Sequence, residues 1–75
     1  MPTLLNEKGF KFFFYANEHE PMHIHVMKGE GFAKINLNDL KVVHNFLKPK
    51  DLKIALAIVS EHRDEFERRW HEWFD

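Results

Sequence analysis

The chain has 75 residues, with 11 Lys and Arg against 12 Asp and Glu, a formal net charge of −1, and no cysteine. A chain of this length forms one small domain, residues 1–75, whose thin core makes every large aromatic side chain important. The lack of cysteine excludes disulfides and thiolate zinc sites, and the balanced charge argues against nucleic-acid binding driven by bulk charge.

Membrane insertion and secretion are not expected. The apolar runs stay well short of the ~20 residues that a bilayer-spanning helix needs. The first residues lack the charged segment followed by an apolar segment that marks a signal peptide. We therefore expect a cytoplasmic protein with no membrane partner.

Aromatic residues mark the first predicted strand, residues 10–15 (FKFFFY). This segment follows Gly9, contains neither Gly nor Pro, and carries aromatic side chains on both of its faces. Such composition is typical of a strand, and two apolar faces predict an inner strand or one that is covered on its second face.

A hairpin of two further strands is predicted after a polar segment. Residues 22–27 alternate apolar side chains on one face with His23 and His25 on the other. A glycine-containing turn at 28–31 leads into the third strand, residues 32–38. We expect the helix that follows to cover the apolar face, which would leave both histidines exposed.

The last third of the chain predicts a helix. Residues 41–45 suit either a short edge strand or a loop, and we favour a short fourth strand. From Pro49 onward the apolar period becomes 3.6 residues, which predicts one helix over residues 50–74. Ser60 could cap a separate second helix, but the apolar stripe keeps its phase through it. The expected fold class is α+β, a three- to four-stranded antiparallel meander with one long C-terminal helix packed across one face.

The end of this helix is the first candidate binding surface. At ~1.5 Å per residue the helix would be ~37 Å long, whereas a domain of this size is only ~30 Å across, so the last turn should overhang the sheet. Trp70, Trp73 and Phe74 lie on that turn, and exposed aromatic residues there predict contact with another copy or with a partner protein. RNA contact through these residues and Arg68–Arg69 is the alternative, although interleaved acidic residues would repel phosphates.

His23-Ile24-His25 is the second candidate site. Histidines at i and i+2 of a strand present both imidazoles on one face, ~6–7 Å apart at Cα, a spacing that suits metal ligation. Glu18 and His19 lie close enough upstream to complete the ligand set of a divalent metal. The two strand histidines would alternatively act as general acid and base in phosphodiester cleavage, or be polar residues on a solvent-facing strand.

His62 interrupts the apolar stripe of the predicted helix. A core histidine bonded to a carbonyl or carboxylate is the simplest interpretation of such a position. It would join His23 and His25 only if the helix covered the histidine face of the sheet, which the apolar pattern opposes.

The stretch FFFYANEHEPMHIHV resembles the signature of a family of very small bacterial proteins described as domain of unknown function 4160. In that family an aromatic strand leads through Asn-Glu and Pro into a His-x-His-Val strand. The likeness extends to the Ala-Lys strand, the EHRDE segment of the helix and the closing WHEWF. The resemblance assigns to the motif, without roles, Asn17, Glu18, His19, Pro21, His23, His25, His62 and Trp70. Two departures are Met22, where a second proline is common, and Lys48, where a capping Ser is usual.

Two classes of function remain open at this stage. Genes of that family tend to lie beside another small uncharacterised protein, an arrangement like that of toxin–antitoxin modules. The resemblance therefore implies a protein-interaction component of such a module. The residues themselves also allow a histidine-based ribonuclease, metal-dependent or metal-free, or a metal-binding protein that uses the His-x-His strand.

Overall fold

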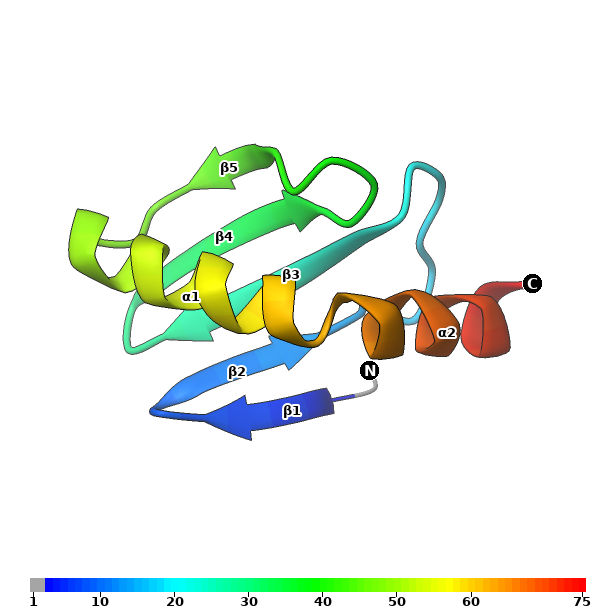
Figure 1. Ribbon diagram of the computed structural model, residues 1–75, viewed down its shortest axis with the longest axis horizontal. Helices are drawn as coiled ribbons and strands as arrows, with labels where there is room; N and C mark the ends of the chain where they lie inside the picture. The colour runs from blue at the N-terminus through cyan, green and yellow to red at the C-terminus, as the bar shows by residue number, and fades with distance from the viewer. Residues whose placement is uncertain (1–2) are drawn as a thin grey trace.

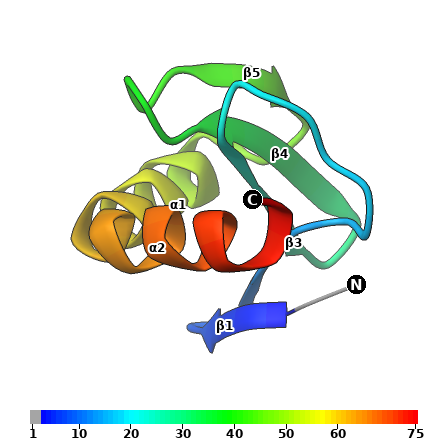
Figure 2. The same cartoon turned by 90° about the vertical axis from the view of Figure 1, so that its right-hand side faces the viewer.

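The computed structural model describes residues 3–75, which form one antiparallel sheet with two helices on one of its faces (Figure 1). The turned view separates the helix layer from the sheet layer (Figure 2). The strands are β1 (Thr3–Glu7), β2 (Phe10–Phe13), β3 (His23–Lys28), β4 (Gly31–Asn36) and β5 (Val42–Asn45), and they pair in sequence order. The helices are α1 (Pro49–Glu61) and α2 (Arg63–Phe74).

The predicted α+β class and antiparallel meander are confirmed, but the sheet has five strands rather than three or four. The short strand expected at 41–45 is β5, whereas β1 was not predicted. Lys8 and Gly9 both have positive φ, 54° and 83°, which is the requirement of a two-residue type I′ hairpin turn. This turn brings Glu7 opposite Phe10 and adds β1 to the edge of the sheet.

The prediction of one helix over 50–74 is wrong, because the helix breaks at His62. The backbone of His62 has φ −103° and ψ 14°, outside the helical region. Its N–H still donates to the Ile58 carbonyl at 3.0 Å, and its carbonyl accepts from Phe66 N–H at 2.9 Å. The break redirects the chain without separating the two helices, so α2 continues to pack against the sheet.

The expectation that Trp70 lies on an exposed, overhanging turn is also wrong, because α2 packs against aromatic residues of β2 and of the chain just after it. Phe66 stacks on Phe12 with ring centroids 5.9 Å apart. Trp70 meets Phe14 edge-on at 5.3 Å and is 1% exposed. The last turn of α2 is therefore partly built into the core.

The core lies between the helices and the face of the sheet that was predicted to be apolar. Burial of large aromatic side chains stabilises a small domain strongly, because each removes roughly 150–250 Å² from water. The buried cluster consists of Phe10, Phe12, Phe14, Ile24, Val26, Ala33, Ile35, Leu37, Leu47, Ala55, Ile58, Val59, Phe66 and Trp70.

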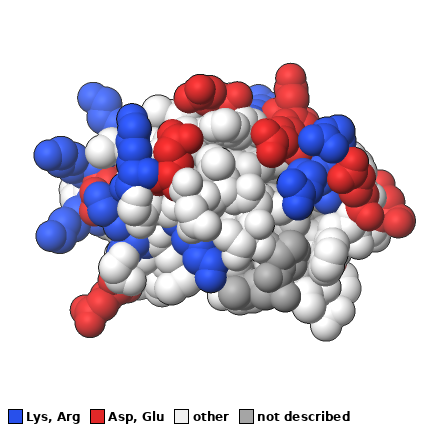
Figure 3. All heavy atoms as spheres, turned by 90° about the horizontal axis from the view of Figure 1, so that it is seen from below, with Lys and Arg blue, Asp and Glu red and all other residues white. Residues whose placement is uncertain are grey.

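Charge is divided between the two ends of the molecule. Lys48, Lys50 and Lys53 lie at the start of α1, and Lys28 at the end of β3 lines the same depression as Lys48. Basic side chains gather at this end in the space-filling view (Figure 3). The arginines of α2 are instead paired with acidic neighbours, as in the Arg68–Glu72 pair at 2.9 Å.

The start of α1 lacks a side-chain cap. Lys48 occupies the N-cap position and makes no capping hydrogen bond, while Pro49 fills the first turn. A capping Ser or Asp would satisfy one of the free N–H groups there and is worth about 1 kcal/mol.

Between residues 3 and 75, no helix is both long and apolar enough to cross a bilayer.

Candidate metal centre

The connection between β2 and β3 brings a carboxylate to the strand histidines. It leaves the sheet after Phe13 and passes over the side away from α1 (Figure 2). Asn17, Glu20 and Pro21 are turn-forming or polar residues that do not extend the strand. The segment rejoins the sheet where the Met22 carbonyl accepts a hydrogen bond from Leu37 N–H at 2.9 Å. Glu18 is thereby held above the start of β3.

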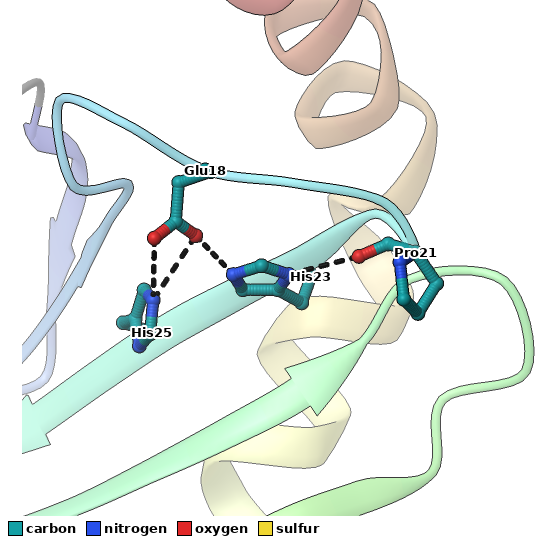
Figure 4. Close-up of polar contacts among 4 residues, drawn as sticks. All are labelled: Glu18, Pro21, His23 and His25. Atoms are coloured by element: carbon teal, nitrogen blue, oxygen red, sulfur yellow. Dashed lines mark hydrogen bonds and ion pairs between the residues drawn. The ribbon is translucent and has the colours of Figure 1, made fainter.

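Three side chains converge between this loop and β3, namely Glu18, His23 and His25 (Figure 4). One potential ligand atom from each lies within 4.8 Å of the others. Glu18 Oε2 contacts His23 Nε2 and lies 3.1 Å from His25 Nε2. The side chains of His23 and Glu18 are only 5% and 6% exposed, so water does little to screen the interaction.

The hydrogen bonds of His23 assign its tautomer. Its Nδ1 lies 2.8 Å from the Pro21 carbonyl oxygen, which can only accept, so Nδ1 carries a hydrogen. In a neutral ring the lone pair of Nε2 then faces the Glu18 carboxylate. Two electron-rich atoms in contact require a cation between them, either a proton that the ring and the carboxylate share or a metal ion.

His25 occupies a more open position beside the same carboxylate. Its Nε2 lies 3.1 and 3.3 Å from the two Glu18 oxygens, and its ring packs on Phe13 and Tyr15 at centroid distances of 5.5 and 4.4 Å. Burial lowers the pKa of His25, an effect that the negative charge of Glu18 opposes and the charge of His23 reinforces. A lowered pKa keeps the imidazole neutral at pH 7, the form that binds metals.

The structure brings together three of the four predicted ligands. Glu18, His23 and His25 meet, whereas His19 is exposed and lies outside the cluster. The expectation that both strand histidines would be exposed is wrong: His23 is buried and His25 is half-buried. Alternation placed both histidines on the same side of β3, where they share the Glu18 carboxylate, but the loop that carries Glu18 folds back over them and Trp70 of α2 contacts His23.

The local sequence does not indicate two of the contacts that hold His23 in place. The ring of Trp70 meets His23 at a centroid distance of 5.1 Å, so the end of α2 supports the buried imidazole. The Pro21 carbonyl orients the same ring from the loop side. Both depend on how distant segments pack, and residue spacing along the chain does not report that.

The remaining candidate residues lie apart from this cluster. His62 lies 3.7 Å from Glu7 and 3.8 Å from Glu65, which is too far for a hydrogen bond, and it does not join the strand histidines. At the end of α2 Trp70 is buried, Phe74 is half-buried, and Trp73 is 53% exposed. Only Trp73 fits the expectation of an exposed aromatic residue.

The donor set indicates which ions the cluster would accept. Two imidazole nitrogens and one carboxylate form the ligand type of catalytic zinc sites with a fourth position for water, and of non-haem iron sites. A ligating histidine usually donates its second N–H to a carbonyl or carboxylate, as His23 does to Pro21. The residues present therefore fit a divalent transition metal.

Comparison with known proteins gives a family without an assigned activity. The family model described as Domain of unknown function (DUF4160) matches residues 9–71. The match includes all three convergent residues and leaves out β1 and Trp73. Neither the curated proteins nor the solved structures contain a match. The chain belongs to the DUF4160 family.

Proposed function

We propose that this member of the DUF4160 family binds a divalent transition metal through Glu18, His23 and His25. The observation that carries the proposal is the contact between the Glu18 carboxylate and the Nε2 lone pair of a histidine whose Nδ1–H is already used. A metal ion would satisfy this contact and the adjacent His25 Nε2 together. Three protein ligands leave a coordination position for water, and zinc lowers the pKa of such a water to about 7.

Metal-free acid–base chemistry by the same residues is less well supported. A general acid or base must reach the substrate atom that exchanges a proton. His23 is buried with both ring nitrogens engaged, and His25 directs its Nε2 at Glu18. Neither Nε2 is free for a substrate, whereas both are oriented to share one cation with the carboxylate.

The test is a metal titration of protein that has never carried a histidine tag. After treatment with EDTA and dialysis, calorimetric titration with Zn²⁺ should give one site per chain. His25→Ala removes one ligand and should weaken binding by at least about 100-fold, the upper range for loss of a supporting contact. Glu18→Gln, which keeps the shape of the side chain, should weaken it similarly.

His19→Ala is the matched control, since His19 lies one residue from Glu18 but is exposed and outside the cluster. Its affinity for Zn²⁺ should equal that of the wild type. Absence of binding by the wild-type chain would show that a proton and not a metal occupies the contact. Equal loss in the His19 variant would show that the ion is not bound by the proposed ligand set.

A second candidate function, a protein-interaction component of a toxin–antitoxin-like module, has its own support. Trp73 is 53% exposed beside a depression of about 170 Å³ that Leu4, Phe14 and Arg69 help to line. Exposed tryptophan beside a hollow is the kind of anchor that dominates protein interfaces. The edge strands β1 and β5 offer additional unpaired backbone groups.

This candidate is tested by co-expression with the protein encoded by the adjacent gene. We expect a complex that survives size-exclusion chromatography and that Trp73→Ala weakens by about 2 kcal/mol or more, the threshold of an interface hot spot. A chain that stays monomeric and forms no complex under co-expression would refute it, and the metal proposal would be unaffected.

A further inference from the structure

The face of the sheet turned away from α1 and α2, here called the open face, carries two rows of side chains that cross neighbouring strands. The pairing of β2 with β3 and of β3 with β4 fixes these rows. One row contains Lys11, Met27 and Phe32, and the other contains Phe13, His25 and Lys34. The second row ends at the candidate metal centre, because His25 belongs to both.

Several aromatic rings near the open face are exposed to solvent, unlike the aromatic rings of the core. Tyr15 is 49% exposed, Phe32 46% and Phe46 65%. The rings of Phe32 and Phe46 lie 4.8 Å apart and tilted by 32°, which forms a small platform. A depression of about 130 Å³ lies between Tyr15 and Phe32. Flat apolar groups can therefore stack at two places along the face.

The charge of the open face is positive even though the chain as a whole is not. Lys11 and Lys34 lie on it, and in the part of the chain that the structure describes its positions on β2, β3 and β4 include no Asp or Glu. The Glu18 carboxylate, which contacts His25 of this face, is turned onto the two histidines. A ligand with planar apolar groups and separated negative charges complements this surface.

We propose that the open face binds single-stranded nucleic acid, with bases stacked on Tyr15, Phe32 and Phe46 and phosphates at Lys11 and Lys34. Stacking requires bases that are free on at least one face, which a duplex does not offer. A second copy of the chain fits less well, since it would bring the same two lysines against each other, and lysine is depleted in protein interfaces. The proposal does not require a metal, although the strand would run past the metal centre.

Fluorescence anisotropy with a labelled oligouridylate of about 12 nucleotides tests the proposal, in EDTA and at low salt. We expect saturable binding that the unlabelled oligonucleotide displaces and duplex RNA does not. Two lysine contacts predict a slope of about −1.4 for log K against log salt, and Lys34→Gln should halve it. Phe32→Ala removes a stacking ring and should weaken binding roughly 5- to 150-fold.

Lys53→Gln is the matched control, because its side chain is exposed and belongs to α1, not to the open face. It should bind the oligonucleotide like the wild type, and circular dichroism should show all variants folded. Equal binding by the Phe32 and control variants would overturn the proposal, as would no binding at low salt. A chain that is dimeric in sedimentation and becomes monomeric with Phe32→Ala would also overturn it, in favour of a protein interface. Binding in EDTA makes each outcome independent of the metal proposal.

Discussion

Replacing Trp70 with alanine should lower the free energy of unfolding by about 3–5 kcal/mol, the range for loss of a buried tryptophan or phenylalanine. Trp70 is 1% exposed and packs on Phe14, Phe74 and His23 at centroid distances of 5.3, 4.5 and 5.1 Å. At roughly 0.05–0.15 kcal/mol per residue the whole domain is stable by only about 4–11 kcal/mol. The substitution should therefore remove between about a quarter and all of the stability of the domain.

Trp73→Ala is the paired measurement, because it removes the same side chain three residues further along α2. Trp73 is 53% exposed, and its loss should change stability by less than about 1 kcal/mol. Urea unfolding followed by circular dichroism gives both values. If the two variants were equally stable, the burial of Trp70 and the position of α2 against the sheet would be wrong.

The two tryptophans also illustrate what the helical pattern predicts and where it fails. Spacings of three and four along the predicted helix place Val59, Phe66 and Trp70 on one face, and all three are buried. The pattern did not reveal that the chain leaves helical geometry at His62, because a break of one residue scarcely changes the phase of the stripe. An unbroken helix implied an overhanging end, and so Trp70 was assigned to an interface when it belongs to the core.

The sheet was more predictable than the helix, because strand alternation depends only on near neighbours. Ile24 and Val26 are buried on the helix side as expected, and Ile35, which pairs with Ile24, is buried with them. The missed strand β1 is an edge strand whose residues Leu4 and Leu5 are adjacent rather than alternating. A bulge between Thr3 and Leu5 accommodates them, and periodicity alone does not indicate it.

The candidate metal centre was predictable in its residue types but not in its burial. His23 and His25 share a face by the period of two, and Glu18 lies within reach along the chain. Whether a loop of polar residues projects into water or folds back over a strand depends on tertiary contacts, here those of Pro21 and Trp70 with His23. Because of these contacts, the two histidines that were predicted to be exposed are largely shielded from water, together with Glu18.

Metal binding should raise the thermal stability of the protein by about 10 to 20 °C at pH 7.5. A ligand at about 100 times its Kd stabilises the folded state by about 2.7 kcal/mol, and 1 kcal/mol corresponds to about 4–8 °C for a domain of this size. The unfolded chain does not hold Glu18, His23 and His25 together, so it does not compete effectively for the ion. Thermal unfolding with Zn²⁺ and with EDTA measures the difference.

The rise in thermal stability on Zn²⁺ binding should disappear as the pH falls, because protons compete with the metal for the imidazoles. Burial lowers the pKa of His25 below the 6.5 of an exposed histidine, while Glu18 opposes and His23 and Lys34 reinforce this effect. The folded state therefore binds the His25 proton less readily than the unfolded state does. This contribution to stability is fully present above pH 6.5 and is lost as the pH falls through the lowered pKa.

We expect a large difference in Tm between Zn²⁺ and EDTA at pH 7.5 and almost none at pH 5. His25→Ala should abolish the difference at pH 7.5, whereas His44→Ala should retain it. His44 is the matched control because it pairs with Lys34 on the adjacent strand, is exposed, and lies outside the ligand set. A Zn²⁺ effect that persists in the His25 variant, or that is equal at both pH values, would place the ion elsewhere on the protein. Loss of the effect in the His25 variant alone would tie metal binding, proton competition and stability to the same imidazole.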